Sequence, residues 1–76
     1  MRSADGWNTF ARGLLKAEMA RRDVSYQDLV GLLRSVGVEE SAENLTNKIN
    51  RGKFSANFFL QCLDAMGCKT IRLSDD

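Results

Sequence analysis

The sequence contains no proline and no histidine, and it has only two cysteines. With no histidine and no CxxC pair, the chain has too few ligands for a structural zinc site. Extracellular domains of this size usually carry about four or more cysteines, so Cys62 and Cys68 are expected to be free thiols in a reducing cytoplasm. The absence of proline fits a chain that is mostly helical.

Long hydrophobic runs and a strong net charge are also missing. No segment approaches the roughly 18 apolar residues of a membrane span, and the first residues, MRSADGWNTFARG, lack the apolar core of a signal peptide. The formal net charge is +1, which argues against strong nonspecific binding of nucleic acid. The sequence therefore predicts a cytoplasmic protein without a membrane partner.

The pattern of apolar residues predicts a single domain, residues 1–76, that is mainly α with four helices, or at most five. The expected helices cover about residues 5–22, 25–37, 41–52 and 55–67. Ser25, Ser41 and Ser55 are the expected N-caps of the last three, and Gly37, Gly52 and Gly67 are expected to end them. Trp7 and Phe10 in the first helix are assigned to the core, in preference to a platform for stacking bases. Val36 is assigned to the buried face of the second helix.

The last part of the chain changes its period. In CKTIRLSDD, side chains alternate as they do in a strand, and Thr70 and Ile71 are strand formers. A single short strand needs a neighbour for its backbone groups, and no other segment resembles one. We therefore expect this strand to pair with its copy in a homodimer, through Lys69, Thr70, Ile71, Arg72 and Leu73.

The third expected helix carries an unusual number of asparagines around two aliphatic anchors, Leu45 and Ile49. Asparagine is a poor helix former, so three of them in one short helix lower its stability unless they contact something. Asparagine, arginine, lysine and threonine are side chains that contact bases and phosphates. The predicted DNA-contacting residues are Asn44, Thr46, Asn47, Lys48, Asn50, Arg51, Lys53, Ser55 and Asn57.

The segments VSYQDLVGLL and KINRGKFSANFFLQCLDAMG give the chain a family resemblance. Together they resemble the helix-turn-helix of Cro and lambda-repressor-type domains, and the ending LDAMGCKTIRL resembles antitoxins of the HipB and HigA type. The chain is also similar to a family of small bacterial domains of unknown function. The resemblance implies a recognition helix that enters the major groove and a terminal strand that pairs across a dimer.

The connection between the second and third helices departs from this family pattern. The stretch RSVGVEESAE is several residues longer than the usual tight turn, so either the second helix continues or the loop is extended. It also brings Glu39, Glu40 and Glu43 next to the third helix, where they would repel phosphates.

Catalysis has little support in the sequence. The acidic residues are scattered, no glycine-rich phosphate loop is present, and Cys62 lies on an apolar helix face where a packing role is expected. We therefore predict neither an enzyme nor a cofactor. The predicted function is a homodimeric transcriptional regulator that binds a pseudo-palindromic site in duplex DNA. The alternative is a protein-interaction adaptor or inhibitor that keeps the fold without strong DNA binding.

Overall fold

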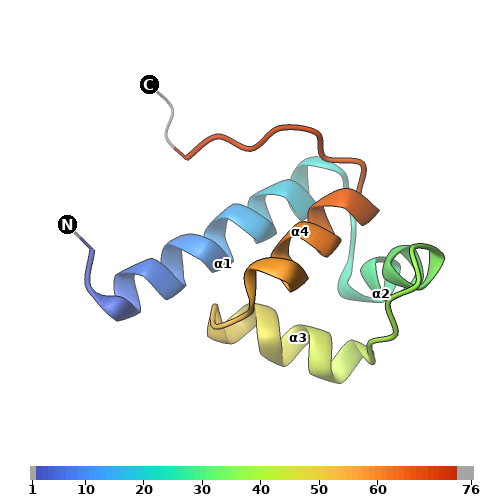
Figure 1. The fold of residues 1–76 in the computed structure, drawn as a ribbon, viewed down its shortest axis with the longest axis horizontal. Helices are drawn as coiled ribbons and strands as arrows, with labels where there is room; N and C mark the ends of the chain where they lie inside the picture. The colour runs from blue at the N-terminus through green and yellow to red at the C-terminus, as the bar shows by residue number, and fades with distance from the viewer. Residues whose placement is uncertain (1, 74–76) are drawn as a thin grey trace.

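The computed structural model describes residues 2–73, which form four α-helices (Figure 1). They are α1 (Ala4–Arg21), α2 (Tyr26–Ser35), α3 (Ala42–Arg51) and α4 (Ala56–Ala65). The long helix α1 packs on α3 and α4, and α2 packs on the same two helices near the other end of the molecule. The predicted class, mainly α with four helices, is confirmed.

Serine side chains cap all four helices at their N-termini. The hydroxyl oxygens of Ser25, Ser41 and Ser55 each accept a hydrogen bond from a backbone N–H one turn into the helix, at 3.0–3.1 Å. The Asp28 carboxylate in turn accepts a hydrogen bond from the Ser25 N–H, at 3.1 Å, which completes a capping box. Ser3 caps α1 in the same way, although the sequence analysis placed no cap there.

Three of the helices end in the same hydrogen-bonded motif. After α2, the N–H of Gly37 donates to the Arg34 carbonyl and the N–H of Val38 donates to the Leu33 carbonyl, which is the Schellman arrangement. The ends of α1 and α4 have the same two hydrogen bonds. After α1, Asp23 takes the left-handed position that glycine takes elsewhere, with a φ of +53°. Helix α2 therefore stops at Ser35, and the long connection to α3 is an extended loop over residues 36–41.

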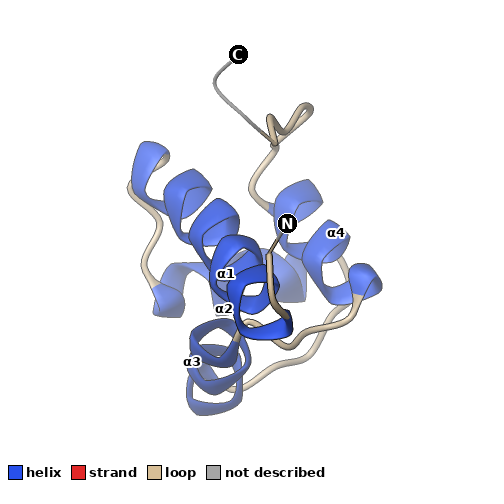
Figure 2. Cartoon of the chain, turned by 90° about the vertical axis from the view of Figure 1, so that its left-hand side faces the viewer, coloured by secondary structure: helices blue, strands red, loops and turns tan. Residues whose placement is uncertain are grey.

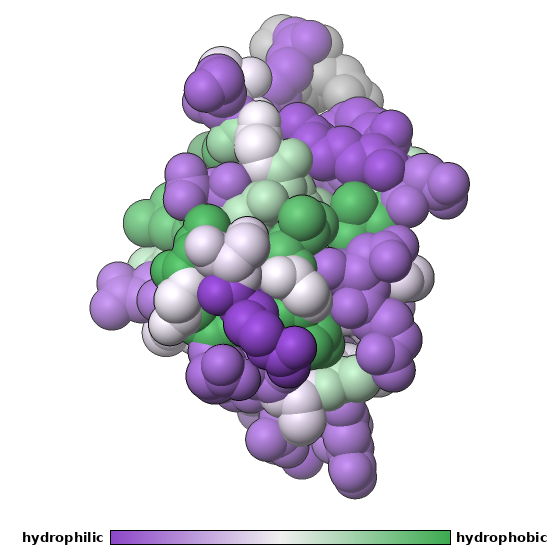
Figure 3. Space-filling model, turned by 90° about the vertical axis from the view of Figure 1, so that its right-hand side faces the viewer, coloured by the Kyte–Doolittle hydropathy of each residue, from purple (hydrophilic) through white to green (hydrophobic). Residues whose placement is uncertain are grey.

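Every helix contributes to one core, which consists of Leu15, Met19, Leu29, Leu33, Leu45, Ile49, Phe58, Cys62 and Leu63. The assignment of two residues to the core is wrong. Trp7 is 51% exposed because the first turns of α1 extend beyond the other helices, and the Arg2 guanidinium lies over its ring. Val36 is 46% exposed, while Val38 packs against the core in its place. On the α2 side of the molecule, hydrophobic residues are visible between hydrophilic ones (Figure 3).

The segment after α4 runs back along α1 as an extended chain (Figure 1). The strand expected over residues 69–73 does not form in the single chain, and residues 2–73 contain no strand (Figure 2). A lone segment has no neighbour to complete a ladder of hydrogen bonds. Instead, Ile71 packs against the core, whereas Leu73 is 67% exposed.

The end of α3 is pressed directly against α1. Gly52 is buried, has a left-handed φ of +68°, and ends α3. A β-carbon at this position would lie 2.8 Å from the carbonyl carbon of Asn8 and still closer to its oxygen. Next to this contact, the Arg12 guanidinium donates to the Asn50 carbonyl at 2.9 Å. The approach of the two helices therefore requires glycine at this position.

Replacing Gly52 with alanine should be unusually destabilising. Gly52→Ala combines a left-handed backbone with a clash against α1, and we expect it to lower the free energy of unfolding by about 3 kcal/mol or more. Gly37→Ala is the matched control, because Gly37 has a φ of +84° and open space around it. The control should cost only about 1–2 kcal/mol. Urea unfolding followed by circular dichroism measures both, and equal losses would contradict the close contact.

Candidate functional site: the polar surface of α3

Helix α3 is held to the core along one narrow stripe. Leu45 and Ile49 are fully buried, and they lie one turn apart on the same face. Most of the predicted contact residues point away from this stripe. The exposed ones are Asn44, Asn47, Lys48, Asn50, Arg51, Lys53, Ser55 and Asn57, whereas Thr46 is half-buried. We call this set of nine residues the α3 surface.

Lys48 is tied to neighbouring residues. Its ammonium group lies 2.9 Å from a carboxylate oxygen of Glu40, whose side chain is only 11% exposed. The same ammonium group lies 4.9 Å from the centre of the Phe58 ring. These contacts fix the loop before α3 to the helix, and they balance the positive charge of Lys48 within the molecule.

Three other members of the α3 surface also have internal partners. The Thr46 hydroxyl donates to the Ala42 carbonyl at 2.7 Å, and the Ser55 hydroxyl caps α4. The amide oxygen of Asn50 accepts a hydrogen bond from the Tyr26 hydroxyl at 3.3 Å. Among the remaining members, Asn44, Asn47, Arg51, Lys53 and Asn57 combine exposure with amide or cationic groups.

The acidic residues near α3 are partly neutralised. Glu40 pairs with Lys48, and Glu39 lies 3.7 Å from the Arg34 guanidinium across two exposed side chains. An exposed pair of this kind contributes little stability, but it places a positive charge beside each carboxylate. Glu43, in the first turn of α3, is exposed.

A second polar cluster surrounds Glu18 on α1. The Glu18 carboxylate is 95% buried, with 5% of the residue exposed. It accepts hydrogen bonds from Arg21 at 2.6 and 2.9 Å and from Arg22 at 3.3 Å. Burial raises the pKa of Glu18, but the hydrogen bonds and charges of the two arginines outweigh it and hold the pKa below its ordinary value. The sequence analysis missed this cluster, although its spacing of three and four residues is that of helix ion pairs.

The two cysteines are free, and they differ in their surroundings. Cys62 is fully buried, and desolvation, with a contribution from the Glu40 charge, raises its pKa to about 12. A thiol of that kind stays protonated and unreactive near neutral pH. Cys68 is half-buried, and its thiol donates to the Thr70 carbonyl at 3.0 Å.

The described residues offer no obvious site for a metal. Nowhere between residues 2 and 73 do three cysteine or carboxylate side chains gather as ligands would. Over the same range, no helix combines the length and the apolar character needed to cross a membrane.

Sequence reasoning missed three partners of the α3 surface. Tyr26 and Arg12 lie 24 and 38 residues from their contacts along the chain, and Glu40 lies in the loop, eight residues from Lys48. Because these contacts depend on how helices pack, no local pattern signals them.

Comparison with known proteins identifies one family. Its model, described as a domain of unknown function (DUF6471), matches residues 7–71. The match includes nearly all of the four helices and the segment that follows them. No curated protein and no solved structure matches the chain.

The buried Glu18 cluster predicts a pH dependence of stability. Because the folded pKa of Glu18 lies below its unfolded value of 4.5, its ionised form stabilises the fold above that pH. This contribution is lost as the pH falls through the folded pKa. Glu18→Gln should therefore lower the urea midpoint at pH 7, and the difference from the unmodified protein should shrink below pH 4. Glu43→Gln, an exposed residue on α3, is the control, and an undiminished difference for Glu18→Gln at acid pH would contradict the ion-pair explanation.

Proposed function

The chain belongs to the DUF6471 family of domains of unknown function, and from its geometry we propose that it binds duplex DNA as a homodimer and regulates transcription. Helix α3 enters the major groove. Asn44, Asn47, Asn50 and Arg51 face the base edges, and Lys53 and Asn57, around the start of α4, contact the phosphate backbone. A regulator of this kind works beside the chromosome, so the proposal includes a cytoplasmic location.

The observation that carries the proposal is the contrast between the two sides of α3. Two buried aliphatic side chains attach the helix to the core, and the remaining surface is built from exposed amides and cations. An α-helix fits the major groove, where asparagine pairs with adenine and arginine with guanine. The pairing of Glu40 with Lys48 and of Glu39 with Arg34 also reduces the repulsion that the acidic loop would exert on phosphates.

The homodimer is supported by the backbone of the last segment. Residues 69–73 are extended, and within the described chain their backbone N–H groups donate no backbone hydrogen bond. Pairing with the same segment of a second copy would satisfy these groups. Two-fold symmetry would then present two copies of α3 to half-sites about one helical turn apart.

A protein-binding surface is the second candidate, and Glu43 favours it. This carboxylate is exposed in the first turn of α3, the end that enters the groove in helix-turn-helix proteins. A negative charge there opposes phosphates and suits a basic protein partner. The two candidates differ in whether duplex DNA binds at low salt.

The DNA-binding proposal is tested first on the unmodified protein and then on an arginine variant. The protein is used to select duplexes from a random pool, and affinity is measured by fluorescence anisotropy at several salt concentrations. Arg51→Ala should weaken binding about tenfold and relax the base preference at the position that Arg51 reads, whereas Lys53→Ala should reduce the salt slope by about 1. Lys48→Ala is a less direct test, because it also leaves the Glu40 carboxylate without its partner.

The matched control is Arg34→Ala, which removes the same charge from an exposed position on α2. It should weaken binding much less than Arg51→Ala, because it only leaves the Glu39 carboxylate in the loop before α3 without its positive partner. The proposal fails if the unmodified protein binds no duplex at about 50 mM salt, or if the two arginine variants weaken binding equally.

The dimer is tested by removing backbone donors without removing Ile71 from the core. Proline has no N–H. In an antiparallel pair, the backbone N–H groups of alternate residues point toward the partner strand, so either Lys69→Pro or Thr70→Pro removes a donor that pairs with it. At least one of them should convert dimers to monomers in light scattering. Alanine at the same positions keeps the N–H and should preserve the dimer. Dimers that persist in both proline variants would rule out strand pairing.

A further inference from the structure

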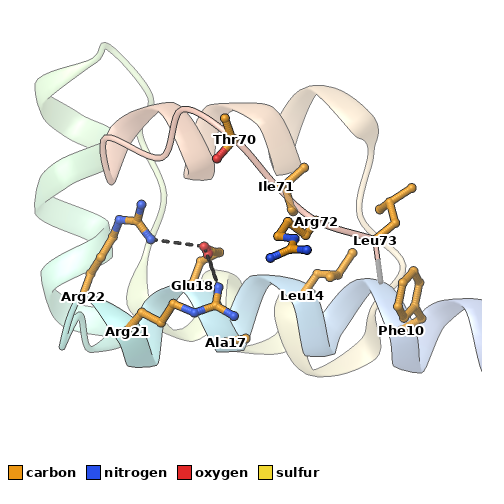
Figure 4. A pocket seen from close by; sticks show the side chains of 10 residues that line it. All are labelled: Phe10, Leu14, Ala17, Glu18, Arg21, Arg22, Thr70, Ile71, Arg72 and Leu73. Atoms are coloured by element: carbon orange, nitrogen blue, oxygen red, sulfur yellow. Dashed lines mark hydrogen bonds and ion pairs between the residues drawn. The ribbon is translucent and has the colours of Figure 1, made fainter. Parts of the chain in front are cut away.

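A cavity of about 550 Å³ lies between α1 and the segment that follows α4. Its lining comes from one face of α1 and from Thr70 to Leu73, which cross over that face (Figure 4). Pockets that hold small molecules have volumes of about 300–1,000 Å³. The cavity therefore has room for a ligand, and none of the predicted DNA-contacting residues lines it.

The two ends of the cavity differ in chemistry. Figure 4 shows Arg21 and Arg22 bound to Glu18 at one end and Phe10 and Leu73 at the other, with the guanidinium of Arg72 between Glu18 and Leu14. Two guanidinium groups bind the single carboxylate and Arg72 adds a third positive charge to the lining, so the cavity carries an excess of positive charge. A ligand that matches this cavity has an anionic head and an apolar body.

Glu18 also prepares the polar end for an anion. Its carboxylate is already bound by Arg21 and Arg22, so both guanidinium groups are held in place before a ligand arrives. Each guanidinium has five N–H donors, and Glu18 occupies only part of them. The planar fork of arginine matches the two oxygens of a carboxylate.

We propose that this cavity binds a small amphipathic carboxylate, with its head at Arg72, Arg21 and Arg22 and its hydrocarbon chain against Phe10 and Leu14. The site lies outside the α3 surface, and the proposal does not depend on DNA binding. A ligand bound there also joins the last segment to α1, because the lining comes from both.

Isothermal titration calorimetry of the unmodified protein tests both halves of the cavity. The probes are sodium octanoate, sodium acetate and octylammonium chloride, with octanoate and octylammonium kept below their micelle concentrations. Octanoate should bind with one ligand per chain, while acetate lacks the apolar body and octylammonium carries the wrong charge. We expect both to bind at least about tenfold more weakly than octanoate. Equal affinity for octanoate and octylammonium would overturn the proposal, as would the absence of saturable octanoate binding.

Arg72→Gln tests the polar end, because Arg72 is exposed and lies outside the core. It should weaken octanoate binding about tenfold. Arg34→Gln removes one positive charge from α2, at a position that does not line the cavity, and should leave the affinity for octanoate unchanged. Circular dichroism verifies that both variants are folded. If both arginine variants lose affinity equally, octanoate responds only to overall charge and the assignment of the cavity is wrong.

Discussion

The contact between Gly52 and the Asn8 carbonyl determines where α3 lies. Two helices that meet through a glycine and a backbone carbonyl have no side chain between them, so their distance cannot vary. Arg12 reinforces the same place by donating to the last turn of α3. Leu45 and Ile49 then enter the core, and the rest of the helix is left facing outward. The orientation of the polar surface is therefore a consequence of backbone packing.

This arrangement separates the residues that build α3 from those that are free to contact a partner. The serine cap, the two aliphatic anchors and the terminal glycine are enough to begin, attach and end the helix. The Glu40–Lys48 pair connects the preceding loop to it. Asn44 and Asn47 serve none of these purposes, and asparagine lowers helix stability. Their presence is most simply explained by an interaction outside the chain.

The local chemistry of the sequence predicted the helices well. Serine caps and the three glycines mark boundaries because they satisfy backbone groups within a few residues. The predictions that were wrong concern how separate segments of the chain pack against one another. Trp7 has helical spacing suited to a core, yet it is 51% exposed, with the Arg2 guanidinium over its ring. Lys48 was expected to face a ligand, but the path of the loop brings Glu40 to it. The last segment has the alternation of a strand, and a single chain contains no partner for it.

The hydrogen bond between Tyr26 and Asn50 changes the balance of hydrogen-bond donors and acceptors on the α3 surface. Because the Asn50 amide oxygen already accepts one hydrogen bond from the Tyr26 hydroxyl, the two donors of its NH₂ group make up most of its free hydrogen-bonding capacity. Arg51 and Lys53, its neighbours, offer only N–H donors from their side chains. This end of the surface is therefore rich in donors and poor in acceptors, a composition that suits a partner presenting lone pairs.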